Sequence, residues 1–432
     1  MKNYLRTVQA FHPDAKRFLM GSFLLSIGTA INDLLFNLHL KNLGNTESFI
    51  GGVISAGAFG IMLCSVPAAF LAKKYSHKAM LIAGVVAVAV LYAVRALVSQ
   101  PVSIMLLSLL IGCAASLVRV IPTALLMRLS TASERTYLFS VNAATGMLGL
   151  VAGAFIGGLL PYLFINLFEL SGRVLLLDDA YRYSLITGAV IESLAAGSFI
   201  GFASTSMPDV FQRPRLSEFL ARLPKRSQLK KILYTVYPHT IVAIGAGAVI
   251  PFIPLYLHDR FGATSQGIGF YMSLVQSAVA VGYVCSPFIA ARLGVLKSIV
   301  VVQLCSLPFM AVMGFSGSIT LVVGAFILRN VLMNMSGPFV EQYTMESVGE
   351  DEREWTSSID ILLWNLAWVV MAAVAGFIIE HYSYQPLFAI TITLYAASSL
   401  VYWRRLRQRR TAGRTAEPPP VHAATASELV ES

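Results

Sequence analysis

Leu38-His-Leu-Lys-Asn-Leu-Gly44 returns later in the chain as Leu255-Tyr-Leu-His-Asp-Arg-Phe-Gly262, with the two leucines and the glycine kept and one residue inserted. Further residues recur at a spacing close to 218: Gly51 and Gly269, Pro67 and Pro287, Glu134-Arg135 and Glu352-Arg353, Ser140 and Ser358, and Gly158 and Gly376. A spacing that holds across most of each half indicates an internal duplication. Because the duplicated stretches are mostly apolar, the repeated unit is predicted to lie in a membrane.

The composition excludes a single soluble domain. Of the 432 residues, 56% are hydrophobic and 12% are charged, and the mean hydropathy is +0.70. A soluble protein of this length has too little interior to hide so much apolar surface, so the remainder is predicted to face lipid. Twelve apolar segments are long enough to span a bilayer. They are roughly 18–40, 49–72, 79–98, 102–127, 137–165, 181–203, 232–257, 267–291, 295–315, 319–345, 357–380 and 385–403.

None of these segments shows the polar and apolar alternation of a membrane barrel strand. Backbone groups in lipid must then be hydrogen-bonded within each segment, so the segments are predicted to be helices. The predicted fold class is an all-α integral membrane protein with twelve transmembrane helices in two six-helix repeats.

Lysine and arginine are concentrated on one side of the predicted membrane. With the N-terminus in the cytoplasm, 25 of the 32 fall on that side and four in loops on the other side, while Arg95, Arg119 and Arg329 lie within segments. The positive-inside rule therefore predicts cytoplasmic termini in the plasma membrane, which is the inner membrane of a bacterium. The net charge of +10 is spread over alternate loops, which favours contact with anionic lipid and argues against a nucleic-acid partner.

Breaks in the apolar pattern divide the chain into five parts. The stretch between the sixth and seventh segments is rich in proline and basic residues, which is typical of a linker, and Leu216 to Leu233 is a candidate amphipathic helix at the membrane surface. The first apolar segment is longer than a signal-peptide core and is expected to stay in the membrane. The parts are an N-terminal arm (1–17), a six-helix bundle (18–203), a basic linker (204–231), a second six-helix bundle (232–403) and a tail (404–432) that is basic and then disordered.

Motifs for catalysis or cofactor binding are missing from the sequence. It has no Gly-Lys-Ser/Thr phosphate-binding loop, no metal-ligand cluster and no nucleophile motif. The four cysteines lie inside apolar segments without metal-type spacing and are expected to be small hydrophobic residues. We therefore expect neither an enzyme nor a cofactor, and any transport is expected to run on existing gradients.

Twelve spans in two parallel repeats, a basic central linker and two termini on the inner side resemble the major facilitator superfamily over roughly residues 15–405. The resemblance implies a monomer that carries a small solute across the membrane by alternating access. It also implies that the first, fourth, seventh and tenth helices line a central cavity.

The best-known loop motif of that family is only partly present. Members carry Gly-x-x-x-Asp-Arg-x-Gly-Arg-Arg between the second and third helices, where an acid and guanidinium groups latch the helix ends. The matching stretch, residues 69–78, has Lys73 in place of the acid and Lys74 after it, and the second half has Arg292 without the acid. The usual latch is therefore not expected to form.

Other charges are expected to replace this latch in part. By the resemblance, they are Glu134 with Arg135 in the first half and Glu352 with Arg353 in the second. Asp360 is expected to join Arg353 in this network at the cytoplasmic side and not to bind substrate. The expected cytoplasmic gate therefore consists of Lys73, Lys74, Glu134, Arg135, Arg292, Glu352, Arg353 and Asp360.

The segment 137–165 carries four glycines that favour close helix packing, namely Gly149, Gly153, Gly157 and Gly158. Their pattern resembles the Gly-x-x-x-Gly-Pro-x-x-Gly-Gly motif of the family's proton-coupled exporters, with alanine in place of proline. The motif favours export. The alternative is close packing without any bearing on the direction of transport.

Polar residues form stripes on two of the helices expected to line the cavity. In the first segment these are Ser22, Ser26, Thr29, Asp33 and Asn37, and in the fourth they are Ser108, Gly112, Ser116, Arg119 and Thr123. Asp33 is a candidate for reversible protonation, because a charged carboxylate is costly inside a bilayer; the alternative is a structural ion pair or a capped bend. Arg119 is always charged, so we expect Asp33 or the substrate as its partner, unless it extends to water at the inner end of its helix.

Further candidates lie in the tenth and sixth segments. Arg329 could clamp a carboxylate or phosphate together with Arg119, or pair with Glu192 or Asp33 as a gate. Glu192 is an intramembrane acid without a local partner and is a second candidate for proton coupling. Asn330 and Asn334 share a helical face, with Arg329 about 100° round from Asn330. The expected substrate or ion pathway consists of Asp33, Asn37, Arg119, Glu192, Arg329, Asn330 and Asn334.

The sequence therefore predicts a secondary active transporter that is coupled to protons and that binds a small molecule and membrane lipid, with export as the favoured direction. Two alternatives use the same fold. A receptor or scaffold that transports nothing would have a solute-tight centre. A lipid flippase would need a lateral opening and a cavity that is half polar and half apolar.

Overall fold

The computed structural model describes residues 11–130, 134–202, 225–349 and 352–415, and these residues are helical with no strand among them. The first half contains α2 (Pro13–Asn42), α3 (Glu47–Lys74), α4 (His77–Leu97), α5 (Pro101–Arg128), α6 (Arg135–Leu170) and α7 (Leu177–Ile200). The second half contains α9 (Arg226–Val249), η1 (Ile250–Phe252), α10 (Ile253–Phe261), α11 (Ser265–Leu293), α12 (Val295–Phe315), α13 (Ile319–Glu346), α14 (Arg353–Tyr382) and α15 (Gln385–Thr415). Within the described residues, twelve helical stretches are long and apolar enough to cross a membrane, which confirms the predicted fold class.

The repeated Leu-x-Leu motif ends one helix and leads to the cap of the next in both halves. Gly44 and Gly262 follow the motif with φ of 80° and 64°, a left-handed conformation that glycine adopts without strain. Two residues later, the Thr46 side chain accepts the Phe49 N–H at 3.3 Å and begins α3. Thr264 accepts the Gly267 N–H at the same distance and begins α11. The duplication therefore repeats a helix stop and a helix start.

The seventh span differs from the expected single helix 232–257. It is divided into α9, the 3₁₀ turn η1 and α10, and it continues to Phe261. Pro251 and Pro254 lie at the break. They interrupt the helix because a proline has no N–H to donate and its ring crowds the preceding turn. Asn37 of α2 donates its Nδ2–H to the Pro251 carbonyl at 3.2 Å, so the break offers a backbone acceptor to the other half.

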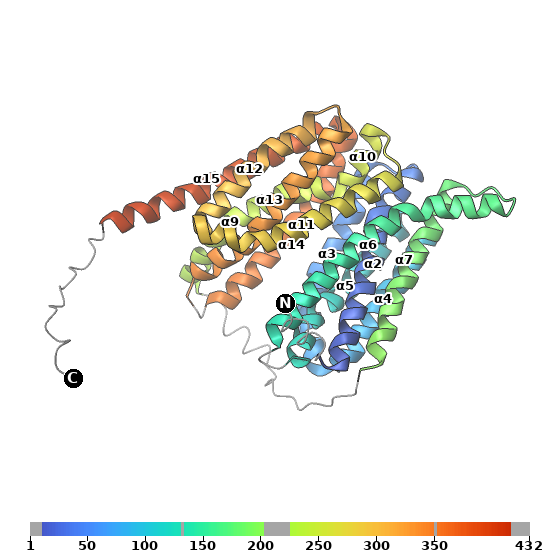
Figure 1. Ribbon diagram of the computed structural model, residues 1–432, viewed down its shortest axis with the longest axis horizontal. Helices are drawn as coiled ribbons and strands as arrows, with labels where there is room; N and C mark the ends of the chain where they lie inside the picture. The colour runs from blue at the N-terminus through green and yellow to red at the C-terminus, as the bar shows by residue number, and fades with distance from the viewer. Residues whose placement is uncertain (1–10, 131–133, 203–224, 350–351, 416–432) are drawn as a thin grey trace, which may run out of the picture.

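The helices form two bundles, α2 to α7 and α9 to α15, that lie closest near α10 and diverge away from it (Figure 1). We call the end where α7 finishes and α9 begins the linker end, and the opposite end the far end. Across the halves, α3 packs on α14 and α6 on α11. Hydrogen bonds join the halves in their far-end portions, including Ser48 N–H to Glu380 Oε2 at 3.1 Å and Ser55 Oγ to the Val369 carbonyl at 2.6 Å.

Two pairs of glycines allow this close approach of the halves. A Cβ added to Gly51 of α3 would lie 3.0 Å from the Cα of Gly376 on α14, and one added to Gly376 would lie 2.4 Å from the Glu47 carbonyl oxygen. In the second seam, a Cβ added to Gly158 of α6 would lie 2.8 Å from the Cα of Gly269 on α11. These three distances leave no room for a side chain, so each seam depends on a glycine from each half.

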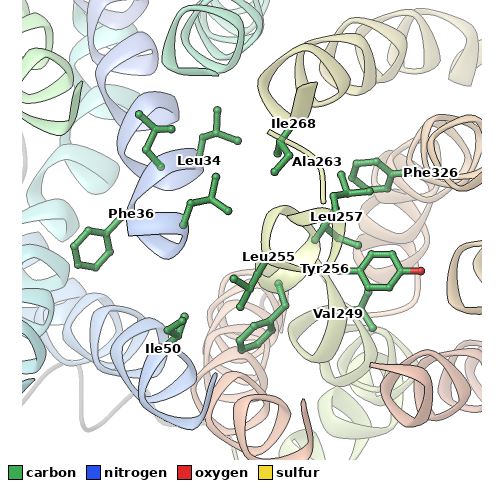
Figure 2. Close-up of a cluster of buried hydrophobic side chains, with 14 of the residues drawn as sticks. Leu34, Phe36, Ile50, Val249, Leu255, Tyr256, Leu257, Ala263, Ile268 and Phe326 are labelled. Carbon is green, nitrogen blue, oxygen red and sulfur yellow. The ribbon is translucent and has the colours of Figure 1, made fainter. Parts of the chain in front are cut away.

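An apolar seal lies between the two seams. Leu34, Phe36 and Ile50 of the first half belong to the same buried cluster as Leu255 and Ile268 of the second (Figure 2). Polar contacts close the far end beyond it. Lys41 of α2 pairs with Glu47 and lies 3.9 Å from the Asp259 carboxylate, which also accepts the Tyr384 hydroxyl at 2.7 Å. In this conformation the far end is closed.

Parts of the expected domain plan lie outside the described residues. These are residues 1–10 of the arm, 204–224 of the linker with half of the candidate amphipathic helix, and 416–432 of the tail. Elsewhere, α9 begins at Arg226, inside the expected linker, and α15 runs on to Thr415, past the expected helix end at 403. Arginine is a good helix former, so the basic stretch after 403 continues the helix beyond the apolar segment.

Candidate functional site

Asp33 lies on α2 between two buried neighbours, yet it is itself exposed. Asn32 is 1% and Leu34 is 5% accessible, whereas Asp33 is exposed. The charges of Arg119 on α5 and Arg95 on α4 act on it, so these three groups lie near one another. A charged side chain is costly in hydrocarbon. Water must therefore reach this face of α2.

Arg95 on α4 acts electrostatically on Asp33 and belongs to the same group of charges. It is 8% accessible, it donates to the Ser108 hydroxyl at 3.1 Å, and its guanidinium carbon lies 3.4 Å from the centre of the Phe36 ring. Such stacking offsets part of the cost of a buried cation. Arg95 is not among the residues expected to line the pathway. A signal was present, because Val85, Val88, Tyr92 and Arg95 follow one helical face and the first three are natural core residues.

Glu192 brings a second acid to the same place. It lies on α7 at 1% accessibility, and its Oε2 has no hydrogen-bond partner among the described residues. Its Cβ would lie 2.6 Å from a Cβ added to Gly28, so this glycine lets α7 press against α2. Electrostatic interactions link Glu192 to Asp33 and Arg95. The structure therefore gathers the two candidate coupling acids around Arg95.

Arg119 is exposed on α5. Among the residues that the structure describes, neither Arg119 nor Asp33 makes a hydrogen bond or an ion pair within 4 Å, although the two charges act on each other. Arg119 also acts on Tyr92 of α4, which lies nearer the far end. The expected direct pair with Asp33 is thus not formed in this conformation.

Arg329 lies apart from this group. It is 2% accessible and donates to the Tyr395 hydroxyl at 2.6 Å and to Asn330 Oδ1 at 3.3 Å. The described contacts therefore place it inside the second half, where it neither clamps a solute with Arg119 nor pairs with Glu192 or Asp33. The physical reason is its position about 100° round the helix from Asn330, which turns the side chain toward α15.

The three asparagines of the expected pathway have separate partners. Asn37 bonds to the Pro251 carbonyl across the halves and so belongs to the far-end closure. Asn330 donates to the Phe326 carbonyl at 2.9 Å and is 8% accessible. Asn334 donates to the Asn330 carbonyl at 2.9 Å and accepts the Tyr283 hydroxyl at 3.3 Å.

Asp360 has a different partner from the one expected. Its two carboxylate oxygens lie 2.9 and 3.0 Å from His239 Nδ1 on α9, and the His239 ring lies 4.7 Å from the Trp364 ring. Arg353 instead directs its Nε–H to the Met345 carbonyl at 3.2 Å. The sequence cannot show that α9 places a histidine opposite Asp360, and this pairing replaces the expected network with Arg353.

The linker end also carries an ion pair between α9 and α14. Lys231 Nζ lies 2.7 Å from Glu352 Oε2, and the Gly349 N–H donates to the same oxygen at 3.1 Å. These two donors, Lys231 first, hold the pKa of the Glu352 carboxyl below its usual range. Of the other expected gate residues, Arg292 is exposed and Glu134 is half-buried, while the side chains of Lys73, Lys74 and Arg135 lie outside the described residues.

The glycines of α6 pack as the sequence allowed. A Cβ added to Gly149 would lie 2.6 Å from the Ser26 Cβ, and one added to Gly153 would lie 2.6 Å from the Ile27 carbonyl oxygen. Gly157 faces Ile31 at 3.2 Å. Three of the four glycines therefore fit α6 to α2, which carries Asp33, and Gly158 fits it to α11.

The sequence also matches a family model. The model described as Major Facilitator Superfamily matches residues 18–177 and 239–430, which is most of the chain. The chain belongs to the Major Facilitator Superfamily. No curated protein matches the sequence of this superfamily member.

Solved structures share its fold at low sequence identity. A mutant of the nucleoside transporter NupG superposes with a TM-score of 0.75 at 15% identity, over 90% of this chain and 99% of that one. A bacterial homologue of the human lysosomal transporter Spinster, inward-facing and unoccupied, gives 0.70 at 12%, over 94% and 98% of the two chains. A D-xylose–proton symporter gives 0.69 at 13%, over 93% and 97%. The superfamily match and the twelve spans indicate a multi-pass membrane transporter, and these neighbours share its fold.

The charged site of this superfamily member is accessible to water. Two acids and two arginines from α2, α4, α5 and α7 meet in the first half, and the outer two of them, Asp33 and Arg119, reach solvent. Within the described ranges no group of three or more His, Cys, Asp or Glu residues could hold a metal ion. The arrangement is suited to binding a proton or a charged solute.

Proposed function

We propose that the protein is a secondary active transporter that moves a small solute by alternating access and couples this movement to protons at Asp33. The observation that carries the proposal is the exposed Asp33 carboxylate, which has no partner among the described residues. A proton that binds there removes a charge from the membrane interior, so the free energy of the site depends on the proton gradient.

The position of Asp33 links this charge to the closure of the far end. Asn37 lies one helical turn further along α2 and donates to the Pro251 carbonyl of the other half. Leu34 and Leu35, which lie within that turn, are buried in the apolar seal. A change of charge at Asp33 therefore acts on the helix that holds the halves together. In the proposed cycle, solute reaches the site from the linker end, the halves rock, the far end opens, and the solute leaves as a proton binds from that side.

The test replaces Asp33 by asparagine in purified protein reconstituted into liposomes. A thermal-shift screen against amino acids, sugars, organic acids and dyes first identifies a solute. Asp33→Asn should then abolish transport driven by a pH gradient, while Asp179→Asn, a far-end change outside the site, should leave it unchanged. Gradient-driven transport at the wild-type rate in Asp33→Asn would remove proton coupling at this residue.

The same liposomes separate transport from two other functions of this fold. A transporter exchanges labelled solute across the membrane by counter-flow. A flippase moves labelled lipid between leaflets, and a receptor or scaffold moves neither. Solute counter-flow without lipid flipping supports the proposal, and any other pattern opposes it.

We further propose a monomer in the bacterial inner membrane, with both termini in the cytoplasm and with export as the direction. The positive-inside distribution supports the orientation. The α6 glycines support export through their resemblance to the exporter motif, although the structure also gives each of them a packing contact. Reporter fusions at the two termini test the orientation, and accumulation in everted vesicles tests the direction.

A further inference from the structure

The two exposed charges of the site have opposite sign and no protein partner. Asp33 and Arg119 act on each other electrostatically, yet no described side chain bonds to either. Two buried groups nearby interact, because Arg95 acts on Glu192, and Arg95 is also bonded to Ser108. The two exposed groups lack a direct contact, so each can bond to a solute.

Helix geometry places these charges on opposite sides of the membrane centre. Counted from the far ends of α2, α7 and α5, with 1.5 Å per residue, Asp33 lies about 14 Å deep, Glu192 about 22 Å and Arg119 about 27 Å. Helices of 28 to 30 residues, such as α5 and α2, are roughly 42 to 45 Å long, so their middle lies near the depth of Glu192. Asp33 is therefore on the far side of the centre and Arg119 on the linker side.

Because α2 and α5 run in opposite directions, the side chains of Asp33 and Arg119 are both expected to lean toward this centre. A helical side chain leans toward the N-terminus of its own helix. α2 begins at the linker end, so Asp33 leans toward that end, whereas α5 begins at the far end, so Arg119 leans toward the far end. The effect of Arg119 on Tyr92, near the far end of α4, agrees with this direction. We therefore expect Arg119 to reach toward the membrane centre and not to water at the linker end of α5.

We propose that the transported solute is a small zwitterion, of the amino-acid class, whose ammonium group binds Asp33 and whose carboxylate binds Arg119. The inference rests on the proposed function in one respect, namely that a solute binds between the halves. When the halves close around it, water leaves and each charge needs a partner. A neutral solute supplies neither partner, and a solute with a single charge supplies one. A zwitterion supplies both.

One consequence concerns coupling. A carboxylate that holds an ammonium group cannot also hold a proton, so proton and zwitterion exclude each other at Asp33. Binding should therefore weaken as the pH falls. The other titratable or charged groups that act on Asp33 or its neighbours are Arg119 of α5, Arg95 and Tyr92 of α4 and Glu192 of α7. Mutual exclusion of this kind drives solute out as protons enter, which agrees with export.

The test compares matched probes on the purified wild-type protein by thermal shift at fixed pH. The probes are the common L-amino acids, the amine and the carboxylic acid obtained by removing one charged group from the best of them, and glucose and uridine as neutral solutes. At least one amino acid should stabilise the protein. Its two single-charge analogues should bind about tenfold or more weakly, because each lacks a charge-assisted hydrogen bond.

Variants then assign the two ends of the probe. Asp33→Asn should weaken binding of the amino acid at least tenfold and leave binding of its carboxylic-acid analogue unchanged. Arg119→Gln should also weaken binding of the amino acid at least tenfold, but it should leave binding of the amine analogue unchanged. Asp179→Asn and Arg173→Gln, outside the site, are the controls. Equal binding of single-charge or neutral probes, or no binding of any amino acid, overturns the proposal on the wild-type protein alone. If the variant that carries both Asp33→Asn and Arg119→Gln binds the amino acid with wild-type affinity, the two residues only pair with each other. That result also overturns the proposal.

These outcomes are independent of proton coupling. If Asp33→Asn abolishes gradient-driven transport of a neutral or anionic solute, the proposed function stands and the zwitterion fails. If an amino acid binds as described but its transport ignores the pH gradient, the zwitterion stands and proton coupling fails.

Discussion

Arg405 shows how single residues fix the second half at its linker end. It is 5% accessible on α15, and it donates to the carbonyl oxygens of Thr235, at 3.2 Å, and Tyr234 on α9. Its guanidinium carbon also lies 4.5 Å from the centre of the Tyr234 ring and 5.2 Å from that of Tyr237. The buried arginine therefore joins the last helix of the bundle to the first.

Replacing Arg405 by glutamine should destabilise the protein by about 2–3 kcal/mol, because two backbone acceptors lose a charged donor and the rings lose a cation. The matched control is Arg404→Gln, since Arg404 is the neighbouring residue on α15 and is exposed. Thermal unfolding in detergent should show a clear loss for Arg405→Gln and almost none for Arg404→Gln. Equal melting temperatures for the two variants would contradict a structural role for Arg405.

Glu352 gives a pH dependence with a definite sign. Its pKa is lowered by the Lys231 ammonium and the Gly349 N–H, so the folded protein binds a proton there less readily than the unfolded chain. The stabilising effect is complete above the unfolded value, about 4.3, and is lost as the pH falls through the lower folded value. The melting-temperature difference between wild type and Glu352→Gln should therefore stay constant from pH 8 to pH 5 and shrink below about pH 4. A difference that changes between pH 8 and pH 5 would argue against this pair.

Arginines in the membrane show what a residue type reveals and what it hides. Their position inside apolar segments marks Arg119 and Arg329, like Arg95, as costly and so as candidate site residues. Their roles differ. Arg119 is exposed on α5, while Arg329, which lies one residue before Asn330 on α13, bonds to Tyr395 inside the second half. The sequence pattern of Arg95 matched a buried face, and only the structure shows its contacts with Phe36 and Ser108 and its electrostatic effect on Asp33.

At the scale of helices, the far-end seams depend on the absence of side chains. A Cβ on Gly376 would lie 2.4 Å from the Glu47 carbonyl oxygen, whereas nothing lies within 4 Å of a Cβ on Gly324 in α13. Gly376→Val should therefore force α14 away from α3 and favour conformations with an open far end. Overpacking of this kind costs about 1–3 kcal/mol, which corresponds to a shift in population of about 5- to 150-fold.

A cysteine in the apolar seal reports this opening. Ile50 is fully buried there, so Ile50→Cys in a background without native cysteines should react slowly with a membrane-impermeant thiol reagent. Gly376→Val should raise the labelling rate by a factor in the same range, and Gly324→Val should not. An unchanged rate in Gly376→Val, with the protein still folded, would show that the seam does not hold the far end closed.

The helices could be predicted from apolar length, and their caps from the Gly-x-Thr pattern that both repeats share at Thr46 and Thr264. The break in the seventh span was not predicted, because a single proline is tolerated inside many helices here, including Pro67 and Pro122. What distinguishes Pro251 and Pro254 is their spacing of three within one turn. Their effect also depends on a partner, Asn37, that the chain reaches only after folding.

At the scale of the whole molecule, the duplication becomes a symmetric closure. The repeat relates Gly51 to Gly269 and Gly158 to Gly376. In the structure, however, Gly51 meets Gly376 and Gly158 meets Gly269, so each seam takes one glycine from each half and the repeat exchanges the two seams. Repetition in the sequence shows which residues are equivalent. It does not show which residues touch, because that depends on how the halves are placed.

The charges break this symmetry. Asp33, Arg95, Arg119 and Glu192 gather in the first half, while the intramembrane arginine of the second half is enclosed by its own bundle. We infer that the first half supplies the charges that bind the solute and that the second half moves against it. Closing and opening then depend on the weak far-end contacts and not on either bundle core.

Distances between the halves, measured at both ends by electron spin resonance on labelled cysteines, test this account most directly. One pair, at positions 173 and 320, spans the far end, and the other, at 76 and 291, spans the linker end. In membranes, the account predicts two populations for each pair, and conditions that lengthen the far-end distance should shorten the linker-end distance. A single fixed distance at each end, or two distances that lengthen together, would contradict alternating access.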